Sequence, residues 1–127
     1  MQTSYMLNSL ETALLCAEAA DGKKAYNIEV LDLRGLTFIA DYFVICSCDN
    51  TTQIGAVIDG IEESLAQAGI RALHIEGKNE TNWVLMDIGD VVVHVFDEQT
   101  RAYYSIERLW GDAPRVLLPM QARTGKG

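Results

Sequence analysis

The sequence predicts a mixed α/β domain in which about five strands form one mixed sheet and the helices pack largely on one face. Apolar residues recur at helical spacing in some segments, short aliphatic and aromatic runs of strand length lie between them, and turn residues separate the two kinds. The predicted order is α-β-β-α-β-β-β-α. With 127 residues the chain has room for one domain, which we place at residues 1–111. Residues 112–127, interrupted by proline and containing glycine and lysine, are predicted to be a mobile tail.

The first predicted helix covers roughly residues 4–21 and ends at Gly22, while Ser4 and Asn8 compete as its start. Its apolar side carries Leu7, Leu10, Leu14 and Ala17. After a short loop, residues 28–33 are aliphatic at most positions and predict a strand that Gly35 ends.

Residues 41–46 are apolar without alternation, which is typical of a strand covered on both faces. Asn50 is then predicted to cap a second helix, and Gln53 is placed to reach back to the amide of Asn50. This helix runs to Gly69. Its buried face is predicted to carry Ile54, Val57, Ile58, Ile61 and Leu65.

The last third of the domain is predicted to be mostly strand. Residues 73–76 alternate between apolar and polar, and residues 83–88 and 91–96 are separated by Gly89-Asp90 alone. Glycine at the first of two loop positions indicates a type II′ hairpin. A terminal helix is predicted from about Gln99 to Leu109, with Tyr103, Ile106 and Trp110 at helical spacing.

The hairpin predicts two different faces, because side chains alternate along a strand. The register that follows from the turn puts Leu85 opposite His94, and Trp83 opposite Phe96. One face is aliphatic and suits packing helices: Val84, Met86, Ile88, Val91, Val93 and Val95. The other face is mixed: Trp83, Leu85, Asp87, Val92, His94 and Phe96. The mixed face is either an exposed surface for a partner, where aromatic residues are enriched, or a surface covered by a second helix layer with His94 bonded inside.

The net charge of the chain limits the classes of partner that it is expected to bind. Its 18 acidic and 10 basic residues give a formal charge of −8, and the basic residues are scattered, so nucleic acid is disfavoured as the main contact. An acidic protein is suited to a basic partner. No apolar stretch approaches the roughly 20 residues that cross a bilayer, and the N-terminus lacks the pattern of a secretory signal. We therefore expect a cytoplasmic protein that does not bind membranes.

Patterns that would indicate catalysis are weak. Asp90 is an ordinary turn former, which argues against a catalytic pair with Asp87, and phosphate-binding glycine motifs do not occur. Four residues are in principle zinc ligands, but their spacing is not of the metal-binding type: Cys46, Cys48, His74 and His94. The cysteines are ordinarily small hydrophobes in a reducing cell. We expect no catalytic residue, metal or cofactor.

Four stretches of sequence form a specific combination: residues 41–46, Glu76-Gly77, Trp83 to Phe96 and Arg101 to Trp110. They contain Trp-x-x-x-Asp-x-Gly-Asp-x-x-x-His, then Arg-x-x-Tyr and a terminal Leu-Trp, within a match from about Leu7 to Trp110. This combination resembles the ribosomal silencing factor family, also called RsfS or Iojap-like.

The resemblance implies a nucleotidyltransferase-like fold without that activity, and the sequence indeed contains no Asp-x-Asp pair for a metal-bound phosphate. It implies binding to the large ribosomal subunit through the basic ribosomal protein L fourteen, which blocks docking of the small subunit and lowers translation when nutrients are short. It also implies that the free protein is often a homodimer.

Under this resemblance the mixed face is expected to be exposed, with aromatic anchors and carboxylates that set register and association rate. The predicted partner-binding residues are Trp83, Leu85, Asp87, His94, Phe96, Glu98, Arg101 and Tyr104. Arg101 and Tyr104 either extend this patch or pin the terminal helix to the sheet, and Trp110 is expected to close that helix as a core residue. The alternatives are a nucleotide-binding or nucleotidyltransferase-type enzyme on the same fold, and a homodimeric adaptor with another basic partner.

Overall fold

The computed structural model describes residues 7–77 and 81–120. Within them lie four helices and five strands: α1 (Ser9–Gly22), β1 (Tyr26–Asp32), β2 (Tyr42–Cys48), α2 (Thr51–Gln67), β3 (His74–Glu76), β4 (Trp83–Asp87), β5 (Val91–Asp97), α3 (Glu98–Tyr104) and α4 (Ile106–Leu109). The strands form one sheet in the order β1-β2-β5-β4-β3. Among these described strands β2 and β5 pair in parallel and the other neighbours pair antiparallel, so the sheet is mixed, as predicted. None of the helices in the described ranges is long and apolar enough to cross a bilayer.

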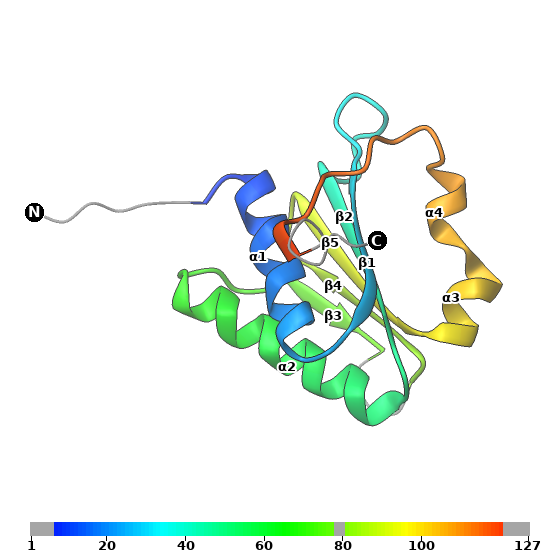
Figure 1. Cartoon of the computed structure of the whole chain (residues 1–127). Helices are drawn as coiled ribbons and strands as arrows, with labels where there is room; N and C mark the ends of the chain where they lie inside the picture. Colours follow the sequence, from blue (N-terminus) through cyan, green and yellow to red (C-terminus); the bar gives the residue numbers. More distant parts are fainter. Residues whose placement is uncertain (1–6, 78–80, 121–127) are drawn as a thin grey trace, which may run out of the picture.

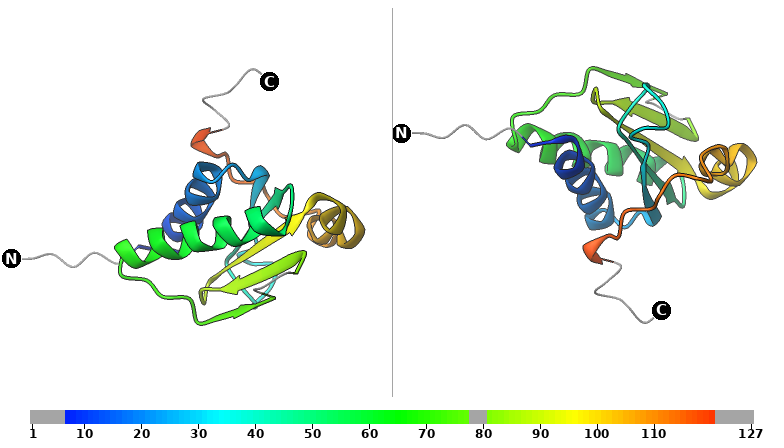
Figure 2. Two further views of the ribbon diagram at one scale, coloured as in Figure 1. Left: turned by 90° about the horizontal axis from the view of Figure 1, so that it is seen from below. Right: turned by 90° about the horizontal axis from the view of Figure 1, so that it is seen from above.

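The two long helices, α1 and α2, cover one face of the sheet, and the short pair α3–α4 lies against the other (Figures 1 and 2). The core under α1 and α2 contains the aliphatic face of the hairpin, including Val84, Met86 and Val93. A second, smaller core lies under α3–α4 and includes Phe43, Phe96 and Ile106. Strand β2 lies between the two cores and is buried along its whole length, which explains its apolar sequence without alternation.

The starts of α1 and α2 are set by asparagine caps. Asn8 accepts the Glu11 amide while the Glu11 carboxylate accepts the Asn8 amide, so Asn8 begins α1; the competing residue Ser4 lies outside the described residues. Asn50 likewise accepts the Gln53 amide. The predicted return bond is wrong by one residue, because Gln53 Oε1 accepts from Asp49, at 2.6 Å. Its amide nitrogen donates to the carbonyls of residues 23 and 24, and this ties the start of α2 to the loop after α1.

The hairpin register is confirmed. Trp83 pairs with Phe96 and Leu85 with His94 across β4 and β5. Gly89 has φ of +98°, a conformation that favours glycine and that a type II′ turn requires at this position. The two-residue turn therefore determines which side chains share a face.

The predicted continuous helix over residues 99–109 is wrong, because the chain breaks into α3 and α4 at Ser105. Ser105 adopts a left-handed conformation, with φ of +45°, and its hydroxyl donates to the Ala102 carbonyl. The break turns Ile106 into the smaller core, whereas Tyr103, which helical spacing placed on the same side, is 81% exposed.

The predicted mobile tail is wrong for residues 112–120, which we call the C-terminal strap. The strap runs along β1: the amide of Asp32 donates to the Pro114 carbonyl, and the amide of Val116 donates to the Val30 carbonyl, both at 2.9 Å. Figure 1 shows this segment, in orange to red, passing from α4 across β1 toward α1. The strap crosses from one core to the other, since Ala113 is buried in the smaller core and Leu118 in the larger. Residues 121–127 of the predicted tail lie outside the described residues.

Candidate partner-binding surface

The mixed face predicted from the hairpin exists, but α3–α4 covers its central part. Phe96 has no exposed surface, and His94 and Val92 are only 4% and 7% exposed. They lie on β5, which has a neighbouring strand on each side, and they pack in the core that Ile106 of α4 closes. The expectation that His94 and Phe96 are exposed for a partner is therefore wrong.

The part of the mixed face that stays open lies on β4, nearer the edge of the sheet. Trp83, Leu85 and Asp87 are half-buried there, and Tyr104 of α3 is exposed beside Trp83. We call these four residues together with Tyr103 the β4–α3 surface. A groove of about 540 Å³ runs between the start of β4 and α3, and the three aromatic residues line it with Thr81, Asn82, Gln99 and Thr100.

The indole of Trp83 is held on three sides. It lies 5.0 Å from the Phe96 ring in a stacked arrangement and 4.8 Å from the Tyr104 ring. Its Nε1–H donates to Nδ1 of His94, at 3.2 Å. Burial lowers the pKa of His94 to about 4, so the imidazole is neutral at physiological pH and its Nδ1 is free to accept this hydrogen bond.

The two predicted carboxylates lie in different places. Asp87 is at the open end of β4, where Oδ1 accepts the Gly89 amide and stabilises the hairpin turn. Glu98 begins α3 but accepts from the Tyr26 hydroxyl of β1, at 3.2 Å. It lines a separate hollow of about 380 Å³ together with Arg101, so the structure does not bring Glu98 to the β4–α3 surface.

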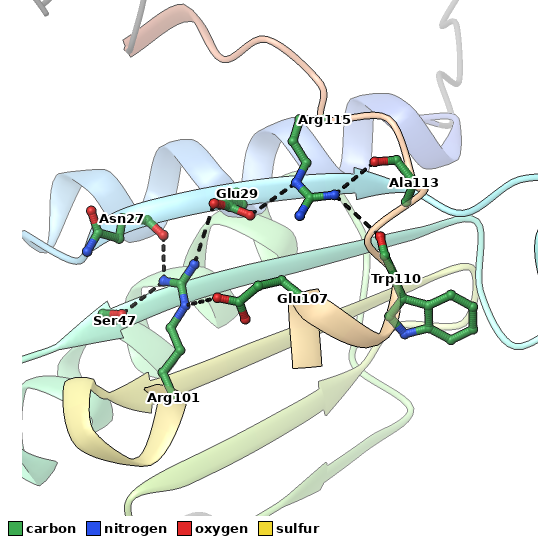
Figure 3. Close-up of polar contacts among 8 residues, drawn as sticks. All are labelled: Asn27, Glu29, Ser47, Arg101, Glu107, Trp110, Ala113 and Arg115. Carbon is green, nitrogen blue, oxygen red and sulfur yellow. Dashed lines mark hydrogen bonds and ion pairs between the residues drawn. The ribbon is translucent and has the colours of Figure 1, made fainter. Parts of the chain in front are cut away.

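Arg101 pins α3 to the sheet, which is one of the two roles that the sequence left open. Its guanidinium is buried and donates to the Asn27 carbonyl of β1, the Ser47 hydroxyl of β2 and the Glu107 carboxylate of α4 (Figure 3). Glu29 lies 4.0 Å from the same guanidinium and also pairs with Arg115 of the strap, at 3.3 Å. This network joins two strands, both short helices and the strap, and it leaves Arg101 unavailable to a partner.

Trp110 contributes to packing, as predicted. Its ring lies 6.2 Å from Phe43 in an edge-to-face arrangement, at the border of the smaller core. Its carbonyl accepts from Arg115, which anchors the strap where it leaves α4 (Figure 3).

Sequence reasoning missed two exposed apolar features. Tyr103 was assigned to the buried side of a continuous helix, and only the break at Ser105 reveals its exposure. The connection between β1 and β2 exposes Leu36, Phe38 and Ile39, with Phe38 fully open to solvent. The signal for this loop was present, because three apolar residues follow Gly35 in a connection that has no helical or strand period.

The potential zinc ligands do not converge. Cys46 and Cys48 face the core under α1 and α2, whereas His94 lies on the opposite face of the sheet and His74 is exposed on β3. Burial raises the pKa of Cys48 to about 12 and raises that of Cys46 further, which keeps both thiols protonated and poorly reactive. Across residues 7–77 and 81–120, no group of three or more His, Cys, Asp or Glu residues is arranged to hold a metal ion.

Comparisons with known proteins give one consistent result. Residues 6–126 match a family model described as "Ribosomal silencing factor during starvation". The chain is 43% identical over 108 residues to a ribosomal silencing factor RsfS of Bacillus subtilis, with 85% of this chain and 92% of the relative covered. It is 41% identical over 112 residues to the RsfS of Halalkalibacterium halodurans, covering 88% and 96%. A crystal structure of a Chromobacterium violaceum protein superposes with a TM-score of 0.80 at 35% identity, covering 83% of this chain and 88% of that one.

Proposed function

The chain belongs to the ribosomal silencing factor family, and from that premise we propose that it binds the large ribosomal subunit through the basic ribosomal protein L fourteen and sterically blocks docking of the small subunit. The observation that carries the mode of binding is the β4–α3 surface. It combines exposed aromatic rings with a half-buried Trp83 that is already supported from below. Aromatic residues at the centre of an interface supply most of the energy in many complexes.

The charge of the protein fits the proposed partner. A net charge of −8 favours encounter with a basic ribosomal protein, and the half-buried Asp87 adds a carboxylate to the same face of β4 as Trp83, at the other end of the strand. Attraction of this kind is screened by salt. Binding is therefore expected to weaken as the salt concentration rises.

Sedimentation with purified large subunits tests the binding step. Wild-type protein is expected to co-sediment at low salt. Trp83→Ala should weaken binding by at least about 2 kcal/mol, since large interface aromatics commonly contribute that much. Because Trp83 also packs on Phe96, its thermal midpoint must be measured alongside.

Tyr103→Ala and Tyr104→Ala separate binding from folding more cleanly, because both rings are exposed, by 81% and 49%. The double variant is expected to bind at least tenfold more weakly and to lower the thermal midpoint less than Trp83→Ala does, because only Tyr104 of the two rings packs on Trp83. Leu117→Ala is a matched control, since this strap residue is also exposed, by 76%, outside the β4–α3 surface. Equal binding by the double variant and the wild type would reject this surface as the docking site.

A subunit-joining assay tests the steric mechanism. Protein added to large subunits before small subunits is expected to reduce the joined particles in a density gradient. Protein added after joining is expected to bind poorly, because the small subunit then occupies the same place. Stable binding to joined ribosomes without loss of joining would contradict steric occlusion.

The same proposal assigns no catalytic step. The hollow beside β2 is lined by Arg101, whose guanidinium donates to the Ser47 hydroxyl, and by three carboxylates, those of Glu29, Glu98 and Glu107. An acidic lining of this kind repels a triphosphate. Calorimetry with magnesium nucleotides at millimolar concentration is expected to show no heat of binding, and a saturable signal would revive the enzyme alternative.

We also propose that the free protein is cytoplasmic and homodimeric. The apolar side chains exposed between β1 and β2, namely Leu36, Phe38 and Ile39, support self-association, since such patches commonly mark interfaces. Sedimentation velocity of the wild type and of Phe38→Ser is expected to show a dimer and a weakened dimer. A monomer at all concentrations would reject the homodimer.

A further inference from the structure

The environment of His94 raises the question of why an imidazole is buried there. His94 is 4% exposed and is surrounded by the rings of Phe43, Phe96 and Trp83, with the Phe43 centroid 4.6 Å away. A leucine or phenylalanine would fill such a site without a polar group. Packing alone therefore does not account for the histidine.

The hydrogen bonds of His94 are one-sided. Its Nδ1 accepts the indole N–H of Trp83, so in the neutral ring the proton is on Nε2. Nε2 is buried and has no hydrogen-bond partner among the described residues. Burying a polar N–H without a partner is unfavourable. The unpaired Nε2–H of His94 therefore lowers the stability of the fold, whereas Nδ1 provides the hydrogen-bond acceptor for Trp83.

The Trp83 indole, which donates this hydrogen bond to His94, is the central ring of the β4–α3 surface. Phe96 supports one side of the ring and Tyr104 lies against it, but stacking contacts permit sliding and rotation in the ring plane. A directed N–H···N bond restricts that rotation, since hydrogen bonds weaken steeply away from linearity. His94 therefore defines how the indole edge is presented at the surface.

We propose that His94 is a positioning residue: it fixes the orientation of the Trp83 indole before the partner arrives, so that docking does not have to order this side chain. The inference rests on the proposed function, because it assigns Trp83 to the docking surface. Ordering one large side chain on binding costs enough to change a dissociation constant by about threefold to tenfold. That is the loss in affinity expected when the acceptor is removed.

Two substitutions distinguish the effect of the hydrogen-bond acceptor at position 94 from the effect of the side chain's packing. His94→Leu removes the acceptor and keeps an apolar side chain in the core. His94→Asn places an amide oxygen near the position of Nδ1 and so retains an acceptor, although it fills less space. Each is compared with the wild type for affinity to purified large subunits and for its thermal midpoint.

Hydrogen exchange of the two indole N–H groups, followed by nuclear magnetic resonance, reads the positioning directly. The chain has two tryptophans, and Trp110 serves as the internal control because the indole that donates to His94 is that of Trp83. In His94→Leu the Trp83 indole is expected to exchange faster while Trp110 is unchanged, and affinity is expected to fall threefold to tenfold. In His94→Asn both properties should stay closer to those of the wild type.

A double-mutant cycle with Trp83→Phe, which keeps a ring but lacks the donor, distinguishes positioning from a general loss of packing. In the Trp83→Phe background, His94→Leu is expected to have no further effect on affinity. An equal effect in both backgrounds, or unchanged Trp83 exchange in His94→Leu, would overturn the inference. If the wild type itself fails to bind large subunits, the proposed function fails, whereas normal wild-type binding with unaltered affinity of His94→Leu refutes only the positioning role.

Discussion

Replacing Arg101 by methionine is expected to destabilise the fold severely, because the guanidinium is the centre of a buried network. It donates to Asn27, Ser47 and Glu107, and the last two distances are 2.9 and 3.1 Å. Methionine fills a similar volume, so the cost comes from the partners that remain. Removing one partner from a buried ion pair costs about 3–5 kcal/mol, because the other charge is left uncompensated. Since the Glu107 side chain is 26% exposed and water can solvate part of its charge, we expect the lower end of this range, about 3 kcal/mol. Given total stabilities of about 5–15 kcal/mol for domains, this is a large fraction.

Urea unfolding measures the effect. With a slope of about 2 kcal/mol per molar urea, a loss of about 3 kcal/mol lowers the midpoint by about 1.5 M. Arg34→Met is the matched control: Arg34 binds Asp32 through two hydrogen bonds at 2.9 and 2.8 Å, but its side chain is 60% exposed. Because the Arg34 guanidinium is open to solvent, the pair contributes little, and its loss should lower the midpoint far less than Arg101→Met does. If both variants unfold alike, burial does not set the importance of these ion pairs, and the assigned role of Arg101 is wrong.

Three further predictions follow from burial and backbone geometry. Alkylation of the native protein at pH 8 should be slow at all three cysteines, because burial raises their pKa values, to about 12 for Cys16 and Cys48. An unfolded thiol ionises near 9.0, so the free energy of unfolding should also decline as the pH rises above that value. In thermal unfolding, Gly77→Ala should destabilise the protein by more than about 1 kcal/mol, because φ is +82° and the new Cβ would lie 2.4 Å from the Trp83 carbonyl oxygen. Gly55→Ala, in open space within α2, should instead stabilise it by about 1 kcal/mol. Leu118→Ala should cost about 2–4 kcal/mol in urea unfolding, because this strap residue has no exposed surface, and an unchanged midpoint would mean that the strap is not docked in solution.

The features that the sequence predicted correctly are local ones. The hairpin register follows from a two-residue turn, and Gly89 alone nearly determines which residues oppose one another. The buried side of α2 follows from its helical period and the Asn50 cap. In each case residues close in the sequence determine the geometry, so a pattern was sufficient.

The errors concern contacts between distant segments. Tyr103, Ile106 and Trp110 have helical spacing, and only the burial of Ile106 and the contact of Arg101 with Glu107 explain a break at Ser105. The strap pairs with β1, which precedes it by more than 80 residues, so no local pattern could reveal it. The candidate site shows the same limit: alternation placed Trp83 and Phe96 on one face, but which ring stays open depended on how α3–α4 packs.

The crossing of the strap from one core to the other has a consequence for how the protein is made. During translation residues 112–120 leave the ribosome after every helix and strand of the domain, so a nascent chain can assemble its sheet while Val30 and Asp32 still offer unpaired backbone groups along β1. Such an open margin invites pairing with neighbouring nascent chains on the same messenger. The strap therefore protects β1 from such pairing once Leu118 has docked in the larger core.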